Sequence, residues 1–299
     1  MLDRHGSFIG GMAQKDFRVL DGAAEQPIVF FTSVEAPAQV LVLVETSPAV
    51  YLIHHQHLIA AYALLEGLAP DDKVALISYD QGPHPILPFT PDKPALAAAL
   101  SQLQYTLGTG ELNFFDSISA VIDWLAPVTG KKSIVILSTG LDSSPPSRWD
   151  LLAQKLRAND VVIFPVALGG SLRQPGPKKK KTAKNSREAA SPTPGLAAEP
   201  ANPLSFAKAD TALLSLAKIT GGHAYFPVSP NEFEGIYREI AAALRHQYVL
   251  GITPAQDGRF HSLTVQVIGA GGQPVPAEGK NAEYRVIARE GYLAPGPQP

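Results

Sequence analysis

The sequence contains no cysteine and no long apolar run. Without cysteine, the chain has no disulfide, no thiolate metal site and no cysteine nucleophile. The run of valine and leucine from Val40 to Val44 stops at Glu45, far short of the ~18 residues that a membrane helix needs. We therefore expect no transmembrane segment, while the lack of cysteine leaves the cellular compartment open.

The chain also lacks an excess of charge of either sign. Its 25 basic and 27 acidic residues give a formal net charge of −2, which provides no overall attraction to nucleic acid or to an anionic membrane. The composition, 45% hydrophobic and 17% charged, is typical of a globular protein. We expect a folded protein that has no nucleic-acid partner.

Motifs of the common enzyme classes are missing as well. The sequence has no Gly-x-Ser-x-Gly turn, and Gly108-Thr-Gly-Glu completes neither of the common phosphate-binding motifs. Ser138 follows a predicted strand, but no spacing of serine, histidine and aspartate singles out a catalytic triad. The sequence therefore favours a protein that is not an enzyme.

Strands and helices alternate through the middle of the chain. Apolar runs at 40–44, 73–79, 133–137 and 161–168 are typical of strands buried on both faces of a sheet. Helical patterns lie at 51–68, 96–107, 116–125, 149–157, 212–219 and 232–244, with a short strand at 223–227. This alternation predicts an α/β fold with a doubly wound, mostly parallel sheet.

The two ends of the chain read differently. Short strands at 17–20 and 27–32, and again at 247–252, 262–268 and 284–288, are separated by turn residues, which is typical of antiparallel pairing. We divide the chain into flanking strands at 1–37, an α/β domain at 38–246, and further strands with a proline-rich tail at 247–299. Because the termini of a doubly wound domain can lie close together, we expect both flanks to form one small β-module.

A segment without apolar pattern interrupts the α/β domain at 171–202. It begins with basic residues, including Lys178 to Lys181, and continues rich in proline, alanine and serine, which predicts a disordered insertion. Its lysines could touch phosphate groups, but no aromatic residues accompany them for base stacking. We interpret it as a solvated linker.

The turns that follow two of the predicted strands carry a family resemblance. Glu45-Thr-Ser-Pro-Ala49 follows the first strand, and Leu137-Ser-Thr-Gly140 ends the third. Further segments that match are Asp3-Arg-His-Gly, Lys15-Asp-Phe, Leu87-Pro-Phe-Thr, Phe115-Asp116-Ser-Ile, Thr220-Gly-Gly, Leu244-Arg-His-Gln-Tyr-Val-Leu-Gly and Ala288-Arg-Glu-Gly-Tyr. Together they resemble the von Willebrand factor A (VWA) superfamily, specifically the VWFA-related domain family described from acidobacterial proteins.

The resemblance implies a VWA fold, a role in protein binding or adhesion, and a metal-ion-dependent adhesion site that holds Mg²⁺ or Mn²⁺. In this sequence the motif is degenerate. Glu45 stands at the first aspartate position, Ser47 at the first serine, Ala49 at the second serine, and Thr139 at the second aspartate. The expected threonine falls near Leu112 or Asn113, and Thr109 is the nearest hydroxyl.

Two functions stay open on this basis. The first is a protein-binding, adhesion or scaffold module that needs no cofactor and uses loop residues to meet its partner. Those loop residues are Glu45, Thr46, Ser47, Ala49, Thr109, Asn113, Thr139 and Asp142. The second is Mg²⁺- or Mn²⁺-dependent adhesion, in which Glu45, Ser47 and Thr139 hold the metal and a partner carboxylate completes its shell, with Asp116 and Asp142 as substitute ligands. A single carboxylate is little charge for a hard dication, which favours the first.

Two expectations complete the sequence analysis. His54 and His57 stand one helical turn apart and could share Zn²⁺ or Ni²⁺, but no third ligand accompanies them, so we interpret them as part of a helix surface. The first ten residues lack a signal peptide, while the resemblance places Met1 inside a strand that relatives extend upstream. We therefore expect an exported protein whose signal is absent from this chain, with the cytoplasm as the alternative. The sequence identifies neither the partner nor the oligomeric state.

Overall fold

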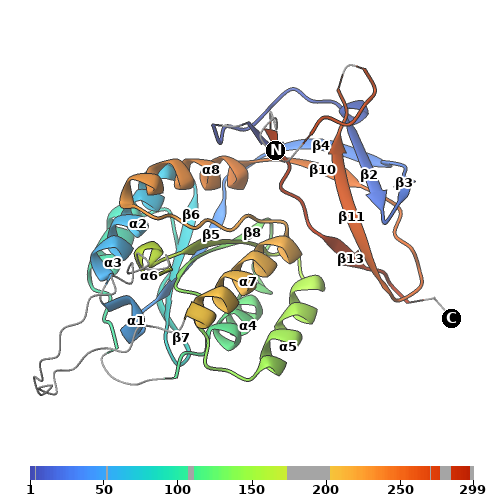
Figure 1. The fold of residues 1–299 in the computed structure, drawn as a ribbon. Helices are drawn as coiled ribbons and strands as arrows, with labels where there is room; N and C mark the ends of the chain where they lie inside the picture. Colours follow the sequence, from blue (N-terminus) through green and yellow to red (C-terminus); the bar gives the residue numbers. More distant parts are fainter. Residues whose placement is uncertain are drawn as a thin grey trace, which may run out of the picture.

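The computed structural model describes residues 1–3, 5–51, 53–106, 111–173, 203–269, 271–276 and 284–296. Figure 1 shows an α/β part with helices around a central sheet, and beside it a smaller part built of strands that carries both chain ends. Within the described ranges, no helix is long and apolar enough to cross a membrane.

The central sheet has five strands in the order β7-β6-β5-β8-β9. Their bounds are β5 Gln39–Glu45, β6 Lys73–Tyr79, β7 Pro83–Thr90, β8 Lys132–Ser138 and β9 Val162–Ala167. All neighbours are parallel except β6 and β7, which confirms the predicted α/β class and its mostly parallel sheet. The sequence analysis missed β7, an edge strand whose pairing is interrupted by register shifts.

Alternate residues of β5 face opposite sides of the sheet, and each side is covered by helices. Val40, Val42 and Val44 pack in the core beneath α2 His54–Gly67, α3 Lys93–Ser101 and α8 Phe233–Arg245. Leu41 and Leu43 pack beneath α4 Phe114–Leu125, α5 Pro146–Arg157 and α7 Pro203–Thr220. Three short helices complete the α/β part and its borders: α1 Pro48–Tyr51, α6 Gly170–Arg173 and η2 Pro230–Glu232.

Several predicted bounds differ from the structure. The helix expected at 96–107 begins earlier and stops at Ser101, and α7 begins at Pro203, well before residue 212. The strand expected at 223–227 is reduced to one bridge between Val166 and Tyr225. The insertion expected at 171–202 starts within α6, and its residues 174–202, with Lys178 to Lys181, lie outside the described residues.

The flanks meet in an antiparallel β-module. Each of three pairs joins one strand of the N-terminal flank to one of the C-terminal flank: β1 Leu2–Asp3 with β12 Tyr284–Arg285, β4 Phe30–Glu35 with β10 His246–Gly251, and β2 Phe17–Asp21 with β11 Phe260–Val267. Strands β3 Ala24–Gln26 and β13 Gly291–Leu293 lie at the edges, and η1 Gln14–Asp16 precedes β2. The predicted strand at 27–32 in fact starts at Phe30. The three domain boundaries stay predictions.

Candidate functional site

Glu45 lies at the carboxyl edge of the central sheet and is fully buried. It is the last residue of β5, where the chain turns toward α1. Thr139 directly follows β8, the parallel neighbour of β5, so the two strand ends bring Glu45, Ser47 and Thr139 together. Their exposed fractions are 0%, 3% and 0%, so none of the three presents a side chain to solvent.

The carboxylate of Glu45 is surrounded by hydrogen-bond donors. The Ser47 hydroxyl donates to Oε1 at 2.5 Å, and the Thr139 hydroxyl lies 3.0 Å from Oε1 and 2.9 Å from Oε2. On the other side, Oε2 accepts from the Thr139 amide at 2.6 Å and from the Ser138 hydroxyl at 2.9 Å, with the Tyr79 hydroxyl at 3.2 Å. Both carboxylate oxygens are therefore used within the chain.

Tyr79 and Ser138 form a hydroxyl pair beside Glu45. Their oxygens lie 2.6 Å apart, and each has one proton, so one hydroxyl donates to Glu45 while the other donates to its neighbour. Burial, and after it the negative charge of Glu45, raises the pKa of the Tyr79 phenol well above its ordinary value. Tyr79 therefore stays a donor at neutral pH. The sequence analysis did not identify it.

This donor set does not fit Mg²⁺ or Mn²⁺. Such an ion wants six oxygens with enough negative charge to compensate for lost hydration, whereas the Ser47 and Thr139 protons point at the only carboxylate of the network. Ala49 has no ligand atom at the second serine position. Across the described ranges, no group of three or more histidine, aspartate and glutamate side chains is arranged to hold a metal.

The two aspartates considered as substitute ligands have other roles. Asp142 accepts from the amides of Phe115 at 3.0 Å and Ser144 at 2.6 Å, which holds its own loop against the start of α4. Asp116 faces Arg148 at 3.5 Å near the surface. Neither carboxylate has a hydrogen bond to Glu45 among those that the structure describes.

The remaining predicted loop residues differ in their surroundings. Thr46 is buried and donates through its amide and hydroxyl to the Tyr79 carbonyl, at 2.8 and 3.2 Å. Asn113 is half-buried and donates to the Gln81 carbonyl at 2.8 Å. Ala49 is half-buried too, whereas Thr109 lies outside the described residues. Thr46, like Glu45, Ser47 and Thr139, is therefore buried and hydrogen-bonded within the chain.

Arg173 is a further part of this edge that the sequence analysis missed. Its side chain is 8% exposed and donates through Nε to the Leu168 carbonyl at 3.1 Å and through Nη2 to the Thr139 carbonyl. Its Nη1 pairs with Asp210 of α7. Burial lowers the pKa of the guanidinium to about 10, and the charge of Glu45 opposes part of that shift. Arg173 is therefore a cation at neutral pH.

Two glycines bring Arg173 to the edge. Gly169 has a φ of +79°, which side chains rarely adopt, and it turns the chain from β9 into α6. At Gly170 a Cβ would lie 2.3 Å from the Pro227 carbonyl oxygen, so only glycine fits. A pair of glycines between a strand and a lone arginine is the signal from which the sequence could have indicated this turn.

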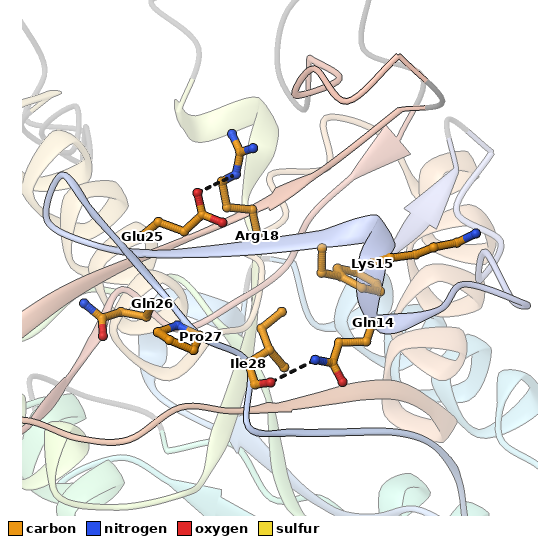
Figure 2. A pocket seen from close by; sticks show the side chains of 8 residues that line it. Gln14, Lys15, Arg18, Glu25, Gln26, Pro27 and Ile28 are labelled. Carbon is orange, nitrogen blue, oxygen red and sulfur yellow. Dashed lines mark hydrogen bonds and ion pairs between the residues drawn. The ribbon is translucent and has the colours of Figure 1, made fainter.

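The other candidates carry less chemistry. The side chains of His54 and His57 are not among those described. A hollow of about 400 Å³ lies in the β-module, beside β2 and the chain that follows β3. Figure 2 shows the side chains that line it. Among its polar side chains, Arg18 pairs with Glu25 at 3.1 Å and Gln14 donates to the Ile28 carbonyl at 2.8 Å.

Comparison with known proteins gives the fold. The sequence matches no protein-family model, and no curated protein matches it. Among solved structures, proximal thread matrix protein 1 from the mussel byssus is 12% identical with a TM-score of 0.50, over 74% of this chain and 49% of the mussel protein. That protein has also been solved with a zinc-occupied metal-ion-dependent adhesion motif.

Two bacterial structures are also similar. A von Willebrand factor type A protein from Catenulispora acidiphila is 12% identical over 89% of this chain and 76% of its own, with a TM-score of 0.49. An aerotolerance-related membrane protein from Bacteroides fragilis is 16% identical over 69% and 96%, with a TM-score of 0.47. Identities this low concern the fold alone. The chain has a mixed, mostly parallel sheet with helices on both faces, and VWA structures are among the solved structures similar to it.

Proposed function

We propose that this chain is a non-enzymatic, VWA-fold module that binds a protein partner, as an adhesion or scaffold element, without a divalent ion. The observation that carries the proposal is the Glu45 network. At the position where the resemblance implies a metal, the carboxylate is fully buried and accepts from hydroxyls and an amide of its own chain. In this proposal, a partner carboxylate has no metal ion whose coordination shell it could complete.

The surface available to a partner is the rim around this network. Tyr51 at the end of α1 is 47% exposed, and Arg148 in the first turn of α5 has a side chain that is 51% exposed. Glu111 before α4 and Pro145 before α5 are exposed as well. These four residues, here called the rim, surround loops that the buried network holds in one arrangement, which favours a preorganised binding surface.

The network also argues against catalysis. Ser138 is 0% exposed and its hydroxyl is engaged with Tyr79 and Glu45. A nucleophile must reach its substrate, and this one lies within the packed edge of the sheet. We therefore propose binding and no reaction.

The first test is metal binding by the purified protein. We expect calorimetric titration with Mg²⁺, Mn²⁺ and Ca²⁺ to give no heat, and melting in metal and in chelator to give the same Tm. An ion that bound only the folded state would add about 2.7 kcal/mol at a hundredfold excess over its Kd. A metal-dependent rise in Tm that Glu45→Ala abolishes would establish the alternative, a rewired site in which Glu45, Ser47 and Thr139 are ligands.

The second test concerns the rim. A partner captured from the natural source is expected to bind equally in chelator and in Mg²⁺, and to be lost with the variant Tyr51→Ala/Glu111→Lys. Glu66→Lys is the matched control, because it makes the same charge change on the exposed end of α2, at the opposite edge of the sheet. Capture that needs the metal, or that both lysine variants reduce equally, would contradict binding through the rim.

We also propose that the natural protein is exported. The proposal rests on the family resemblance alone. Fractionation of the natural source with an antibody to this chain tests it, since recovery of the full-length product in the cytosol would contradict export.

A further inference from the structure

The Thr139 peptide lies between two buried charges. Its amide and hydroxyl donate to Glu45, while its carbonyl accepts from the guanidinium of Arg173. The carboxylate is fully buried and the arginine side chain nearly so. A buried charge is costly unless an opposite charge and hydrogen bonds compensate for it.

We propose that Arg173 is the resident cation of this edge, a fixed positive charge of the chain itself that compensates Glu45 and holds the Thr139 loop where the resemblance implies a metal. The proposal deepens the metal-independent binding proposed above, and depends on it only for the role of the rim. Arg173 is a positioning residue, because it acts through Thr139.

The surroundings of Arg173 use each nitrogen of its guanidinium. Nε binds the Leu168 carbonyl, Nη1 pairs with Asp210, and Nη2 binds the Thr139 carbonyl. The guanidinium carbon lies 5.0 Å from the ring centre of Phe206 and 5.9 Å from that of Phe226. A planar fork held on two aromatic rings has little freedom, so the charge stays in one place.

A fixed guanidinium differs from a metal in two ways that matter for binding. It does not exchange with solution, so chelators leave the edge unchanged. It also has no vacant coordination position for a partner carboxylate. Because the pKa of Arg173 is about 10, the charge persists across the neutral pH range. Binding at the rim is then constitutive and does not respond to divalent ions.

The charge of Arg173 can be separated from its packing by substitution. Arg173→Met keeps an apolar stem and removes the charge, and we expect its Tm to fall by about 5 °C or more. Arg173→Lys keeps the charge and loses the planar guanidinium, so its Tm should fall by less than that of the methionine variant. Equal losses for the two would mean that only packing matters, which would overturn the proposal.

A double-mutant cycle with Glu45→Gln tests the compensation itself. If Arg173 compensates the carboxylate, Arg173→Met should cost less in the Glu45→Gln background than in the wild type, by about 3 °C or more in Tm. If the methionine variant does not fold, Arg173→Gln takes its place in the cycle, because it also removes the charge but keeps an amide donor for the Thr139 carbonyl. Additive losses would contradict the proposal.

Arg157→Met is the matched control for the cycle. Arg157 also pairs with a carboxylate, Glu290 at 3.4 Å, and lies 5.1 Å from the ring centre of Phe260, but it ends α5, where that helix meets the β-module. The fall in Tm caused by Arg157→Met should be the same in the wild type and in the Glu45→Gln background. If Arg157 were coupled to Glu45 as strongly as Arg173 is, the effect would be nonspecific and the assignment would be overturned. Because the readout is stability without metal or partner, failure here is distinct from failure of the proposed binding.

Discussion

At the scale of single residues, the side-chain length of Glu45 decides how the edge is closed. The resemblance places an aspartate at this position. A glutamate is one methylene longer, and here its carboxylate accepts from Ser138 and Thr139 at the end of the neighbouring strand. Thr139 stands where the resemblance places a second acidic residue. The group opposite the Glu45 carboxylate is therefore a hydroxyl that donates a hydrogen bond, where a second carboxylate would add another negative charge.

Glu45→Gln is predicted to destabilise the protein strongly. The amide nitrogen of glutamine would bring a donor against hydroxyl and amide donors in a buried site, which costs about 3 kcal/mol. Urea unfolding followed by tryptophan fluorescence measures the loss. Glu66→Gln on the exposed surface of α2 is the control and should change the free energy of unfolding by less than about 0.5 kcal/mol. Equal stability of the two variants would show that the Glu45 carboxylate is not engaged as described.

The sequence could place some of these residues together but not the whole network. Glu45, Ser47 and Thr139 follow from strand ends that share one edge of a parallel sheet. Tyr79 pairs directly with Glu45 in the register of β5 and β6, so aligning the ends of the two predicted strands could have indicated it. Arg173 was not placed, because the sequence analysis assigned residues 171–202 to a disordered insertion, whereas Arg173 ends α6 in the structure.

At the scale of elements, the Thr220-Gly-Gly segment after α7 acts by permitting close approach. Gly221 has a φ of +75°, and a Cβ there would lie 2.7 Å from the backbone nitrogen of Arg289. At Gly222 a Cβ would lie 1.9 Å from the Ile163 carbonyl oxygen. The two glycines let β9 and the C-terminal flank pass against the end of α7.

Gly221→Ala is predicted to cost about 2 kcal/mol or more, because it combines a left-handed backbone with a backbone clash. Thermal or urea unfolding measures the loss. Gly235→Ala is the control, since nothing lies within 4 Å of a Cβ at that position in α8. There alanine should be neutral or add about 0.5–1 kcal/mol. Similar effects of the two substitutions would contradict the role of close approach at Gly221.

His261 links two elements of the β-module through its ring nitrogens. Nδ1 lies 2.8 Å from Asp21 at the end of β2, and Nε2 lies 3.1 Å from Asp257 in the loop before β11. Tyr292 of β13 stacks on the ring, with ring centres 5.2 Å apart, and donates to Asp21 at 3.3 Å. The hydrogen bond that the ring donates to Asp257, and after it the one to Asp21, raise the pKa of His261.

The raised pKa of His261 predicts a stability that depends on pH. The protonated imidazole donates to both carboxylates, so its contribution is fully present below the ordinary histidine pKa of about 6.5 and is lost as pH rises through the higher folded value. The difference in Tm between wild type and His261→Gln should therefore be largest near pH 6 and shrink toward pH 9. His5→Gln, at an exposed position, should leave the profile unchanged. A difference that grows with pH would contradict the assignment.

The sequence predicted those elements whose apolar residues form a clear pattern. β6 was predicted with its observed bounds, because the run from Val74 to Tyr79, which is buried throughout, is mostly apolar. β7 was missed, since prolines at 83, 85 and 88 interrupt the pattern and are tolerated only at a sheet edge. The start of α7 was missed because the alanines and polar residues between 203 and 211 resemble the insertion before them.

At the scale of the whole molecule, the C-terminal flank attaches the β-module to the helices of the α/β part. Arg285 pairs with Glu239 of α8 at 2.7 Å, and Glu290 with Arg157 of α5 at 3.4 Å. Arg289 donates to the Asn159 carbonyl at 2.9 Å, just past the end of α5, where a cation also meets the negative end of the helix dipole. In Figure 1 the module lies at the end of the sheet opposite α1 and α6, so this attachment leaves the rim uncovered.

Because these contacts involve partly buried charges, we predict that the two parts unfold together. Trp124 and Trp149, the only tryptophans, both lie in the α/β part and report on it alone, while amide hydrogen exchange in β2 and β11 reports on the module. In the wild type the two probes should give one transition.

Arg289→Ala removes the hydrogen bonds at the end of α5 and should cost about 2 kcal/mol of unfolding free energy, with the module amides exchanging before the tryptophans are exposed. Arg259→Ala, an exposed arginine of the module, should leave the transitions coincident. Separate transitions already in the wild type would mean that the β-module is an independent unit, and that the contacts of Arg285, Arg289 and Glu290 orient it without coupling its stability to that of the α/β part.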